Sequence, residues 1–364
     1  MPKQTEKSFF ETLRALQHHY TADEIRKLFS QVDEQRVKTL AGILNTYILQ
    51  NLPTAIEKRE GLADYRTNPY VLLTCASVMQ LDQPDRFADF LFNNKLYMGL
   101  ETSFGKSIEA AFVGAYPLSK NAKYKWTEPP EKAAEAAKLV GLRKEEKTRV
   151  RTSSVWREID KSCVVGNRRF MTSIKSGPNC INDTQVGGMT NAIGKNYRTW
   201  LEQTRRTYPQ VTALDVAVGL TYGTDRTTNN KENQILVKLL DLGFVEENRA
   251  KAPGVLIDSE TKSVRVYRRI GKEFWAFIGA PNNPRSATFV FLEVVLALSK
   301  ALSGGMQAGN LEEKINRKIQ ALATALSKLN FPRQSLPEWV RKDFSENELF
   351  WFATAISAFY DEGI

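Results

Sequence analysis

Residues 171–181 read Met-Thr-Ser-Ile-Lys-Ser-Gly-Pro-Asn-Cys-Ile. Apolar residues alternate with polar ones, which is the pattern of a β-strand whose two faces meet different surroundings. The strand carries Lys175 to its end and breaks at Gly177-Pro178, because a Gly-Pro pair is a strong turn signal. Position 175 is therefore where we expect chemistry.

A partner strand is expected upstream, at residues 155–160 with the sequence Val-Trp-Arg-Glu-Ile-Asp. The pair Gly166-Asn167 is the expected hairpin turn, because glycine and asparagine tolerate the backbone that tight hairpins need. Ser173 and Lys175 are two residues apart, so their side chains leave the same face, and Asp160 lies across the hairpin from them. One acid and one lysine can thus meet across a hairpin.

The composition is that of a folded, moderately basic protein. Of the 364 residues, 42% are hydrophobic, and Lys plus Arg exceed Asp plus Glu by 51 to 41. This charge favours a polyanionic partner, although a basic surface without such a role gives the same count. Three widely spaced cysteines and two histidines support neither a disulfide framework nor a zinc site. No stretch is long and apolar enough to cross a membrane, so we expect a cytoplasmic protein without membrane contact.

Three regions follow from the spacing of apolar residues and turn signals. Residues 1–95 and 286–364 have helical periodicity, whereas residues 96–285 contain the strand signals of an α/β core. Within the core, lysines and glutamates alternate over residues 119–151, which indicates a charged surface insertion that could touch DNA. One exposed helix is expected there, at residues 131–139.

The remaining elements of the core and of the C-terminal region are expected as follows. Helices are predicted at 103–112, 183–207, 234–242, 271–279, 287–302, 311–329 and 346–360, a buried strand at 211–222, and a hairpin at 255–267. Asn182 is the expected cap of the helix that starts at Asp183. A polar loop at 223–233 separates the buried strand from the next helix.

Asp160 and Lys175 together indicate phosphodiester cleavage on a metal ion. That reaction needs a metal to neutralise the phosphate oxygens, a positioned water, and a cation near the reacting oxygens. Carboxylates and a lysine around one phosphate meet these needs. Magnesium is the expected ion, because it takes oxygen ligands and keeps several of its waters.

The order of these motifs resembles the PD-(D/E)XK nucleases, and more narrowly a group of type II restriction endonucleases. Their core reads like G-I-D, a hairpin, S-I-K-S-G-P-N, and then N-x-x-Q opening a helix. The matching stretches here are residues 158–160, 173–179 and 182–185. The resemblance extends to residues 102–109 and 271–275, so it covers roughly residues 102–279 and leaves both ends unassigned.

The resemblance implies a central mixed sheet flanked by helices, with helical N- and C-terminal extensions. It implies Asp160 as a magnesium ligand, Lys175 as the residue that orients or activates the attacking water, and Glu109 as a second carboxylate carried by a helix. Gln185, one turn into the following helix, is expected to hold the water or Lys175 in place.

One position departs from the pattern. Ser173 stands two residues before the lysine, where most members carry Asp or Glu, so the missing metal ligand must come from elsewhere or be absent. Glu109 is the first choice for the replacement, with Asp183 and Glu158 behind it.

Reading a DNA sequence requires donors and acceptors that reach base edges, whereas Lys and Arg along the flanks grip phosphates. The candidate DNA-binding residues lie in the polar loop, at the end of the 255–267 hairpin, and around the Gly-Pro turn. They are Arg226, Asn229, Asn230, Lys231, Arg268, Arg269, Asn179 and Asn182. A solvated basic face explains each cluster equally well when it is taken singly.

The favoured interpretation is a magnesium-dependent type II restriction endonuclease that cuts a short palindrome in double-stranded DNA. The resemblance implies that the palindrome is rich in G·C pairs, and cutting both of its strands calls for a homodimer. Two alternatives stay open: a repair or mobile-element nuclease with the same core, and a DNA-binding protein whose active site has decayed. Each candidate residue alone also has an ordinary explanation, so the prediction depends on their order along the chain.

Overall fold

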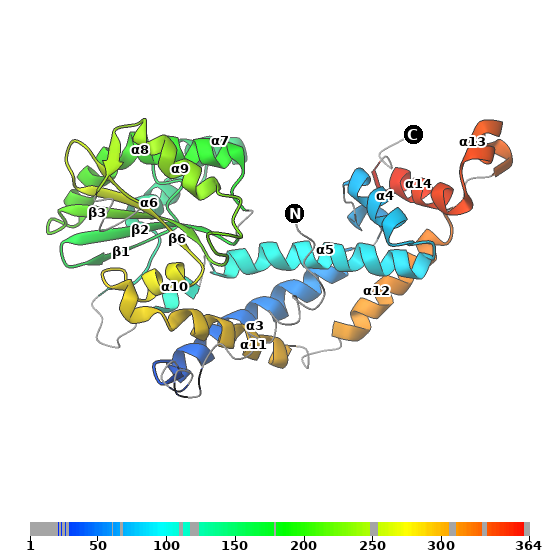
Figure 1. The fold of residues 1–364 in the computed structure, drawn as a ribbon, viewed down its shortest axis with the longest axis horizontal. Coiled ribbons are helices and arrows are strands. Elements are labelled where there is room, and N and C mark those ends of the chain that lie inside the picture. Colours follow the sequence, from blue (N-terminus) through cyan, green and yellow to red (C-terminus); the bar gives the residue numbers. More distant parts are fainter. Residues whose placement is uncertain are drawn as a thin grey trace. The chain divides into compact units, whose positions relative to one another are not determined.

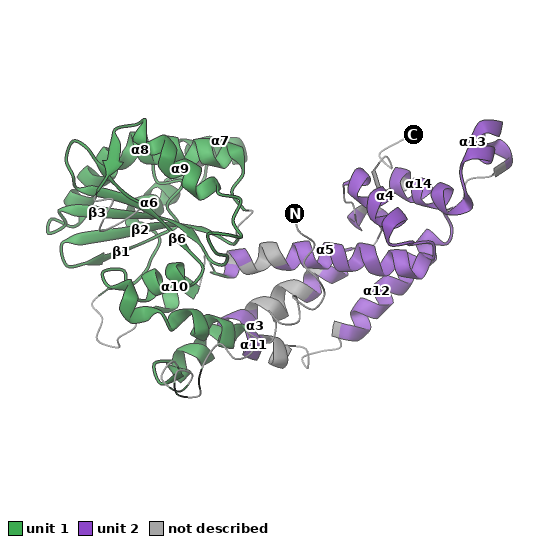
Figure 2. Cartoon of the chain, viewed as in Figure 1, with its two compact units in different colours: residues 1–41, 108–298 green, residues 42–107, 299–364 purple. Residues whose placement is uncertain are grey.

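The computed structural model describes residues 21, 23, 26, 29–59, 61–65, 68–108, 112–116, 124–177, 180–247, 254–305, 311–329 and 333–359. The chain forms two compact units, which are coloured separately in Figure 2. Unit 1 contains residues 1–41 and 108–298, and unit 2 contains residues 42–107 and 299–364. The division differs from the three expected regions, because the N-terminal and C-terminal helical segments share one unit.

A six-stranded mixed sheet forms the centre of unit 1, as shown in Figure 1. Its strands are β1 (Lys161–Val165), β2 (Arg168–Lys175), β3 (Ala213–Leu220), β4 (Phe244–Glu246), β5 (Val255–Asp258) and β6 (Val264–Ile270). The order across the sheet is β1-β2-β3-β6-β5-β4. Strands β2, β3 and β6 run parallel, and the other three pair antiparallel to their neighbours. The expected α/β class with a mixed sheet is therefore confirmed.

The β1–β2 hairpin differs from the expectation in its first strand. Gly166 turns the chain with a φ of +62°, as expected, and β1 pairs with β2 from Lys161 onwards. Residues 155–158, however, form a turn rather than a strand. Trp156 and Ile159 are both buried, so their three-residue spacing follows a turn and not the two-residue period of a strand.

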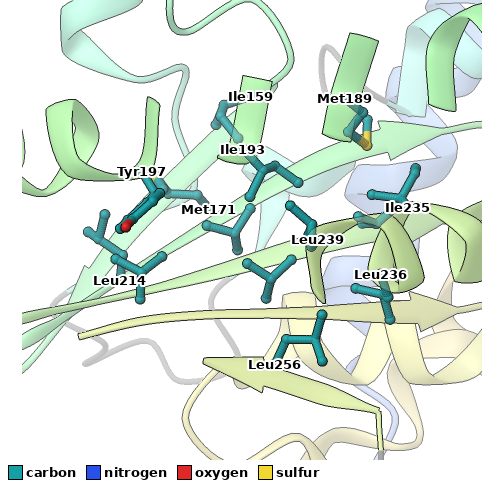
Figure 3. Packing of buried hydrophobic residues seen from close by; sticks show 14 of the residues in the cluster. Ile159, Met171, Met189, Ile193, Tyr197, Leu214, Ile235, Leu236, Leu239 and Leu256 are labelled. Atoms are coloured by element: carbon teal, nitrogen blue, oxygen red, sulfur yellow. The ribbon is translucent and has the colours of Figure 1, made fainter. Parts of the chain in front are cut away.

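Helix α8 (Asp183–Thr207) connects β2 to β3 and begins at the predicted cap. The side chain of Asn182 accepts a hydrogen bond from the backbone N–H of Gln185, and the side chain of Gln185 accepts one from the N–H of Asn182. This reciprocal capping box fixes the first turn. One face of α8 is apolar and packs on β2 and β3, for example Met189 and Ile193 near Met171 in Figure 3.

Helix α9 (Lys231–Leu240) covers the same face of the sheet beside α8, and α10 (Lys272–Gly279) packs on the opposite face. Phe277 of α10 makes edge-to-face ring contacts with Phe170 on β2 and Tyr267 on β6. Gly219 permits this approach, because a Cβ atom there would come within 2.5 Å of Phe274. The backbone of β2 would also be too close, at 2.7 Å.

The charged stretch before β1 is held against the core. It contains α6 (Pro130–Ala137) and α7 (Lys144–Ser153). Trp126 is buried and donates its indole N–H to the carbonyl of Ile278, and residue 127 bridges to β1. Glu131 forms a bidentate ion pair with Arg169, a fully buried residue of β2. The stretch is therefore part of the fold and not a loosely attached insertion.

Three further elements complete unit 1. They are η3 (Val113–Ala115), η4 (Pro284–Ala287) and the first part of α11 (Val290–Gly305). Glu293 of α11 is buried and accepts hydrogen bonds from the hydroxyl of Tyr116, the guanidinium of Arg36 and the backbone N–H of Asp33. Arg36 belongs to α3 (Glu34–Glu57), so this buried carboxylate joins segments far apart in the sequence.

Unit 2 is helical and draws on both ends of the chain. Besides the second part of α3 (residues 42–57) and the end of α11, its elements are η1 (Leu62–Tyr65), α4 (Pro69–Val78), α5 (Pro84–Ser107), α12 (Leu311–Leu326), η5 (Arg333–Ser335), α13 (Glu338–Asp343) and α14 (Glu346–Phe359). Helix α12 packs on α5, and α14 packs on α4. Phe87, Leu91 and Leu326 are among the residues of its buried core.

Most expected helices are present with shifted ends. Helix α9 starts three residues before its predicted start, and α13 was not expected. The helix expected at residues 103–112 coincides at its start with the last turn of α5, which ends at Ser107. Among the described residues, no helix has the length and apolarity needed to span a membrane.

Candidate functional site

The three parallel strands end together at one edge of the sheet. Their register aligns Lys175 on β2 with Leu220 on β3, and Leu220 with Ile270 on β6. We call this region the carboxyl edge, and its described residues are 175–177, 180–183, 221–231 and 270–272. Open α/β sheets bind ligands outside the carboxyl ends of their strands, so this edge is the expected place for a site.

Asp160 lies beside the last residues of β2. Its backbone N–H donates to the carbonyl of Thr172 at 2.9 Å, and its carboxylate Oδ2 accepts from the backbone N–H of Ile174 at 2.6 Å. The carboxylate thus takes the place that a strand carbonyl would have opposite Ile174. Ile174 directly precedes Lys175 in β2.

Lys132 approaches Asp160 from α6. Its ammonium donates to the carbonyl of Ile159 at 2.9 Å and lies 3.9 Å from Oδ1 of Asp160. The buried side chains of Trp156 and Ile159 hold the preceding turn, and the indole N–H of Trp156 donates to Gln203 on α8. Asp160 is therefore fixed by the backbone, by packing and by a neighbouring positive charge.

Lys175 is half-buried at the end of β2. Within the described part of the chain its ammonium makes no hydrogen bond or ion pair with another side chain. Ser173 lies on the same face, is buried, and has its hydroxyl 3.8 Å from the sulfur of Met189 on α8. The serine hydroxyl therefore meets the sulfur of Met189, at the position where a carboxylate would stand in the family pattern.

The segment after β3 is tied to the segment after β2. The backbone N–H of Thr221 donates to the carbonyl of Lys175 at 3.0 Å, and its hydroxyl donates to the carbonyl of Ser176 at 2.9 Å. Asn229 donates from its side-chain amide to the carbonyl of Ile181 at 2.9 Å. These bonds hold the polar loop against residues 175, 176 and 181 as one wall of the carboxyl edge.

Several predicted site residues have structural partners in this wall. Gln185 and Asn182 cap α8, so the side-chain oxygen of Gln185 is already used as an acceptor. Lys231 forms an ion pair with Asp183, and this ammonium lowers the pKa of the Asp183 carboxyl. Asn230 has a left-handed backbone, with a φ of +60°, and precedes the first residue of α9.

The arginines differ strongly in their surroundings. Arg268 contacts Asp225 at 3.0 Å and Glu232 at 3.4 Å, which reduces the charge it presents to a ligand. Arg226 is exposed in the polar loop at the same edge. Arg269 projects from the opposite face of β6, where it packs on the ring of Tyr267 at 4.3 Å.

The structure places Asp160 beside the backbone of residues 172–174, which precede Lys175, and leaves the rest of the proposed metal set open. Glu109 and Asn179 lie outside the described residues. Glu158, a reserve ligand, pairs with Arg157 at 3.5 Å. The described part of the chain contains no group of three or more His, Cys, Asp or Glu suited to a metal. Asp160 supplies one carboxylate, which fits the way magnesium is bound by one or two carboxylates and several waters.

Sequence reasoning missed Lys132. It lies in the stretch expected to be a surface insertion, 28 positions before Asp160 in the sequence. The sequence offered only the amphipathic pattern of α6, which indicates that one face of the helix packs on the protein but does not identify the residues that Lys132 contacts.

Comparison with protein-family models and with curated proteins found no match for this chain. The assignment of a function therefore depends on the geometry of the carboxyl edge and on the motifs that lead to it.

Proposed function

We propose that the protein is a magnesium-dependent endodeoxyribonuclease of the type II restriction class, with a PD-(D/E)XK-like core. The observation that carries the proposal is the position of Asp160 beside Ile174, next to Lys175 at the end of the same hairpin. The order of the hairpin and then α8 also follows the motif order of the resemblance.

Lys175 is the proposed residue that orients or activates the attacking water. Its ammonium forms no ion pair with a carboxylate of the described residues, so it can contact a phosphate oxygen or a water. Asp160 is the proposed metal ligand, because the backbone N–H of Ile174 holds its Oδ2 beside the last residues of β2, next to Lys175. A bound magnesium ion would neutralise the phosphate and lower the pKa of a water.

Ser173 does not supply the second carboxylate of the family pattern. Glu109 remains the proposed replacement. Asp183 is a weaker candidate, because its carboxylate already pairs with Lys231 and it lies in the exposed first turn of α8. Removal of Glu109 should thus abolish metal-dependent cleavage, whereas removal of Asp183 should not.

The substrate we propose is a short palindrome in double-stranded DNA, with G·C-rich sequence, cut by a homodimer. Arg226 is the leading candidate for a base contact, because it is exposed in the loop at the carboxyl edge. A homodimer would place two such edges around a two-fold axis, which is what symmetric cutting of both strands needs.

The test is a digest of fully sequenced plasmid DNA with magnesium, followed by mapping of the fragment ends. Discrete ends at one palindromic sequence are expected from the parent protein. Lys175→Ala should reduce the rate at least about 100-fold, which is typical for loss of a group that assists proton transfer or charge stabilisation. Lys262→Ala is the matched control, because this lysine is exposed in a turn at the opposite edge of the sheet.

The alternatives give different results in the same digest. A repair or mobile-element nuclease yields ends without a common sequence, and a decayed DNA-binding protein yields a shifted band without fragments. Full activity of Lys175→Ala, with DNA binding unchanged, would rule out the catalytic assignment.

A further inference from the structure

Neighbouring arginines on β6 have different roles because strand side chains alternate between the two faces of the sheet. Arg268 points to the face of α8 and α9 and is held by Asp225 and Glu232. Arg269 points to the face of α10, where its guanidinium packs on Tyr267 and donates to the carbonyl of Arg268 at 3.1 Å. Ring packing and one backbone contact fix Arg269 without neutralising it.

Arg269 lines an open groove of about 580 Å³ beside α10. We call it the α10 groove. Its charged lining residues are Arg269, Lys272, Arg285 and Glu273, so three cations face one acid. Within the described residues, Lys272, Arg285 and Glu273 form no ion pair, and all three are exposed. The groove therefore keeps its positive charge available to a ligand.

The adjoining groove, of about 370 Å³, serves as an internal comparison. It shares Arg269 with the α10 groove, but its two other arginines are paired: Arg168 with Asp215 at 2.5 Å, and Arg265 with Glu247 through its Nε at 2.7 Å. Each of these two guanidiniums already has a carboxylate partner. The positive charge on this side of the sheet is thus concentrated in the α10 groove.

We propose that the α10 groove binds the phosphodiester backbone of duplex DNA. The inference rests on the proposed function for the choice of nucleic acid. Lys272 follows β6 directly at the carboxyl edge, the same edge at which β2 carries Lys175. Duplex DNA that reaches Lys175 can extend over this edge, and unpaired Lys and Arg side chains in an open groove grip phosphates without reading bases.

The test measures binding of a fluorescently labelled DNA duplex by anisotropy, without divalent metal, over a series of salt concentrations. The triple variant Arg269→Gln, Lys272→Ala, Arg285→Ala removes the cations and keeps part of the arginine stem on Tyr267. If all three contact phosphates, the slope of log K against log salt should fall by about 2.7, because each phosphate contact contributes about 0.9. Affinity at about 0.1 M salt should fall on the order of 100-fold.

Two further variants make the result specific. Arg205→Ala, Arg206→Ala, Lys262→Ala removes the same charge from exposed positions at the opposite edge and should leave the slope unchanged. Glu273→Gln removes the acid from the α10 groove and should strengthen binding several-fold. A gain of affinity cannot be caused by loss of folding.

The outcomes separate this inference from the nuclease proposal. An unchanged slope in the groove triple, or an equal loss in the opposite-edge triple, would overturn the α10 groove as a DNA surface, whatever the fate of cleavage. Tighter binding of a duplex RNA of the same sequence than of DNA would overturn the assignment to DNA. Loss of binding in the groove triple, together with full cleavage by Lys175→Ala, would support the groove and reject the catalytic assignment.

Discussion

Oδ2 of Asp160 accepts a hydrogen bond from the backbone N–H of Ile174 at 2.6 Å. The carboxylate therefore completes the hydrogen bonding of β2 at the point where β1 has not yet begun. A side chain with this role contributes to folding as well as to any chemistry, so the two contributions must be separated by choice of substitution.

Asp160→Asn and Asp160→Ala are expected to separate them. The asparagine oxygen can still accept from Ile174, whereas alanine leaves a buried N–H without a partner, which costs about 1–3 kcal/mol. Both variants should lose metal-dependent cleavage, but only Asp160→Ala should show a clearly lower free energy of unfolding in urea. Equal stability of the two variants would contradict the structural role of the carboxylate.

The buried pair of Arg169 and Glu131 should behave as one unit. Arg169→Met leaves the Glu131 carboxylate without its partner, and loss of one member of a buried pair costs about 3–5 kcal/mol. Adding Glu131→Gln should recover part of that loss, because no unpaired charge then remains. The measurement is a double-mutant cycle of unfolding free energies. Additive effects of the two substitutions would show that the pair is not coupled.

Gly219→Ala is expected to destabilise unit 1 by about 1–3 kcal/mol, the usual range for overpacking of a core. The added methyl group would come within 2.5 Å of the ring of Phe274 and 2.7 Å of the carbonyl of Ser173. Gly187→Ala is the matched control, because its Cβ would meet nothing within 4 Å. Thermal unfolding of both variants measures the difference, and equal melting temperatures would contradict the packing.

Asp258 should make the stability of the sheet depend on pH. Burial raises the pKa of its carboxyl, but hydrogen bonds from the backbone N–H groups of Val264, Thr261 and Ser263 outweigh burial and bring the pKa below its usual value. A lowered folded-state pKa contributes stability above the unfolded pKa, near 3.9, and that stability is lost as pH falls through the folded value.

Asp258→Asn should therefore be less stable than the parent at neutral pH by about 1–3 kcal/mol, the cost of weakened bonds to a buried charged acceptor. The difference should shrink as the pH falls below about 4, where the unfolded parent takes up a proton at Asp258 while the folded carboxyl does so only at lower pH. Urea unfolding at several pH values measures it. A difference that stays constant down to pH 2 would contradict this role of the carboxylate.

The sequence predicted the end of β2 and the start of α8, because the turn signal after Lys175 and the Asn182 cap are local features. The two differently exposed faces expected of β2 are absent, since residues 169–174 are all buried in a strand that lies between β1 and β3. The strand predicted at residues 155–160 was wrong, because residues 155–158 form a turn. Trp156 of this turn packs on Trp200, which lies far away in the sequence, with the ring centroids 5.9 Å apart. A short apolar run in the sequence does not show which distant residue will pack on it.

The candidate site was predictable only in part. Asp160 directly precedes β1 and Lys175 ends β2, so their proximity along the chain path follows from the hairpin. The neutralisation of Arg268 depends on Glu232, a buried acid of α9, and the approach of Lys132 depends on how α6 packs. Those relationships are set by tertiary packing, which the spacing of residues along the chain does not encode.

Unit 2 is assembled from residues 42–107 and 299–364, with α12 packed on α5. A fragment that stops before residue 299 would lack α12 and α14, and Phe87 and Leu91 of this core would then be exposed to water. Such a fragment should aggregate, and adding the missing C-terminal peptide during refolding should rescue it. A shortened form of this protein must therefore keep the C-terminal helices α12 and α14 together with α4 and α5.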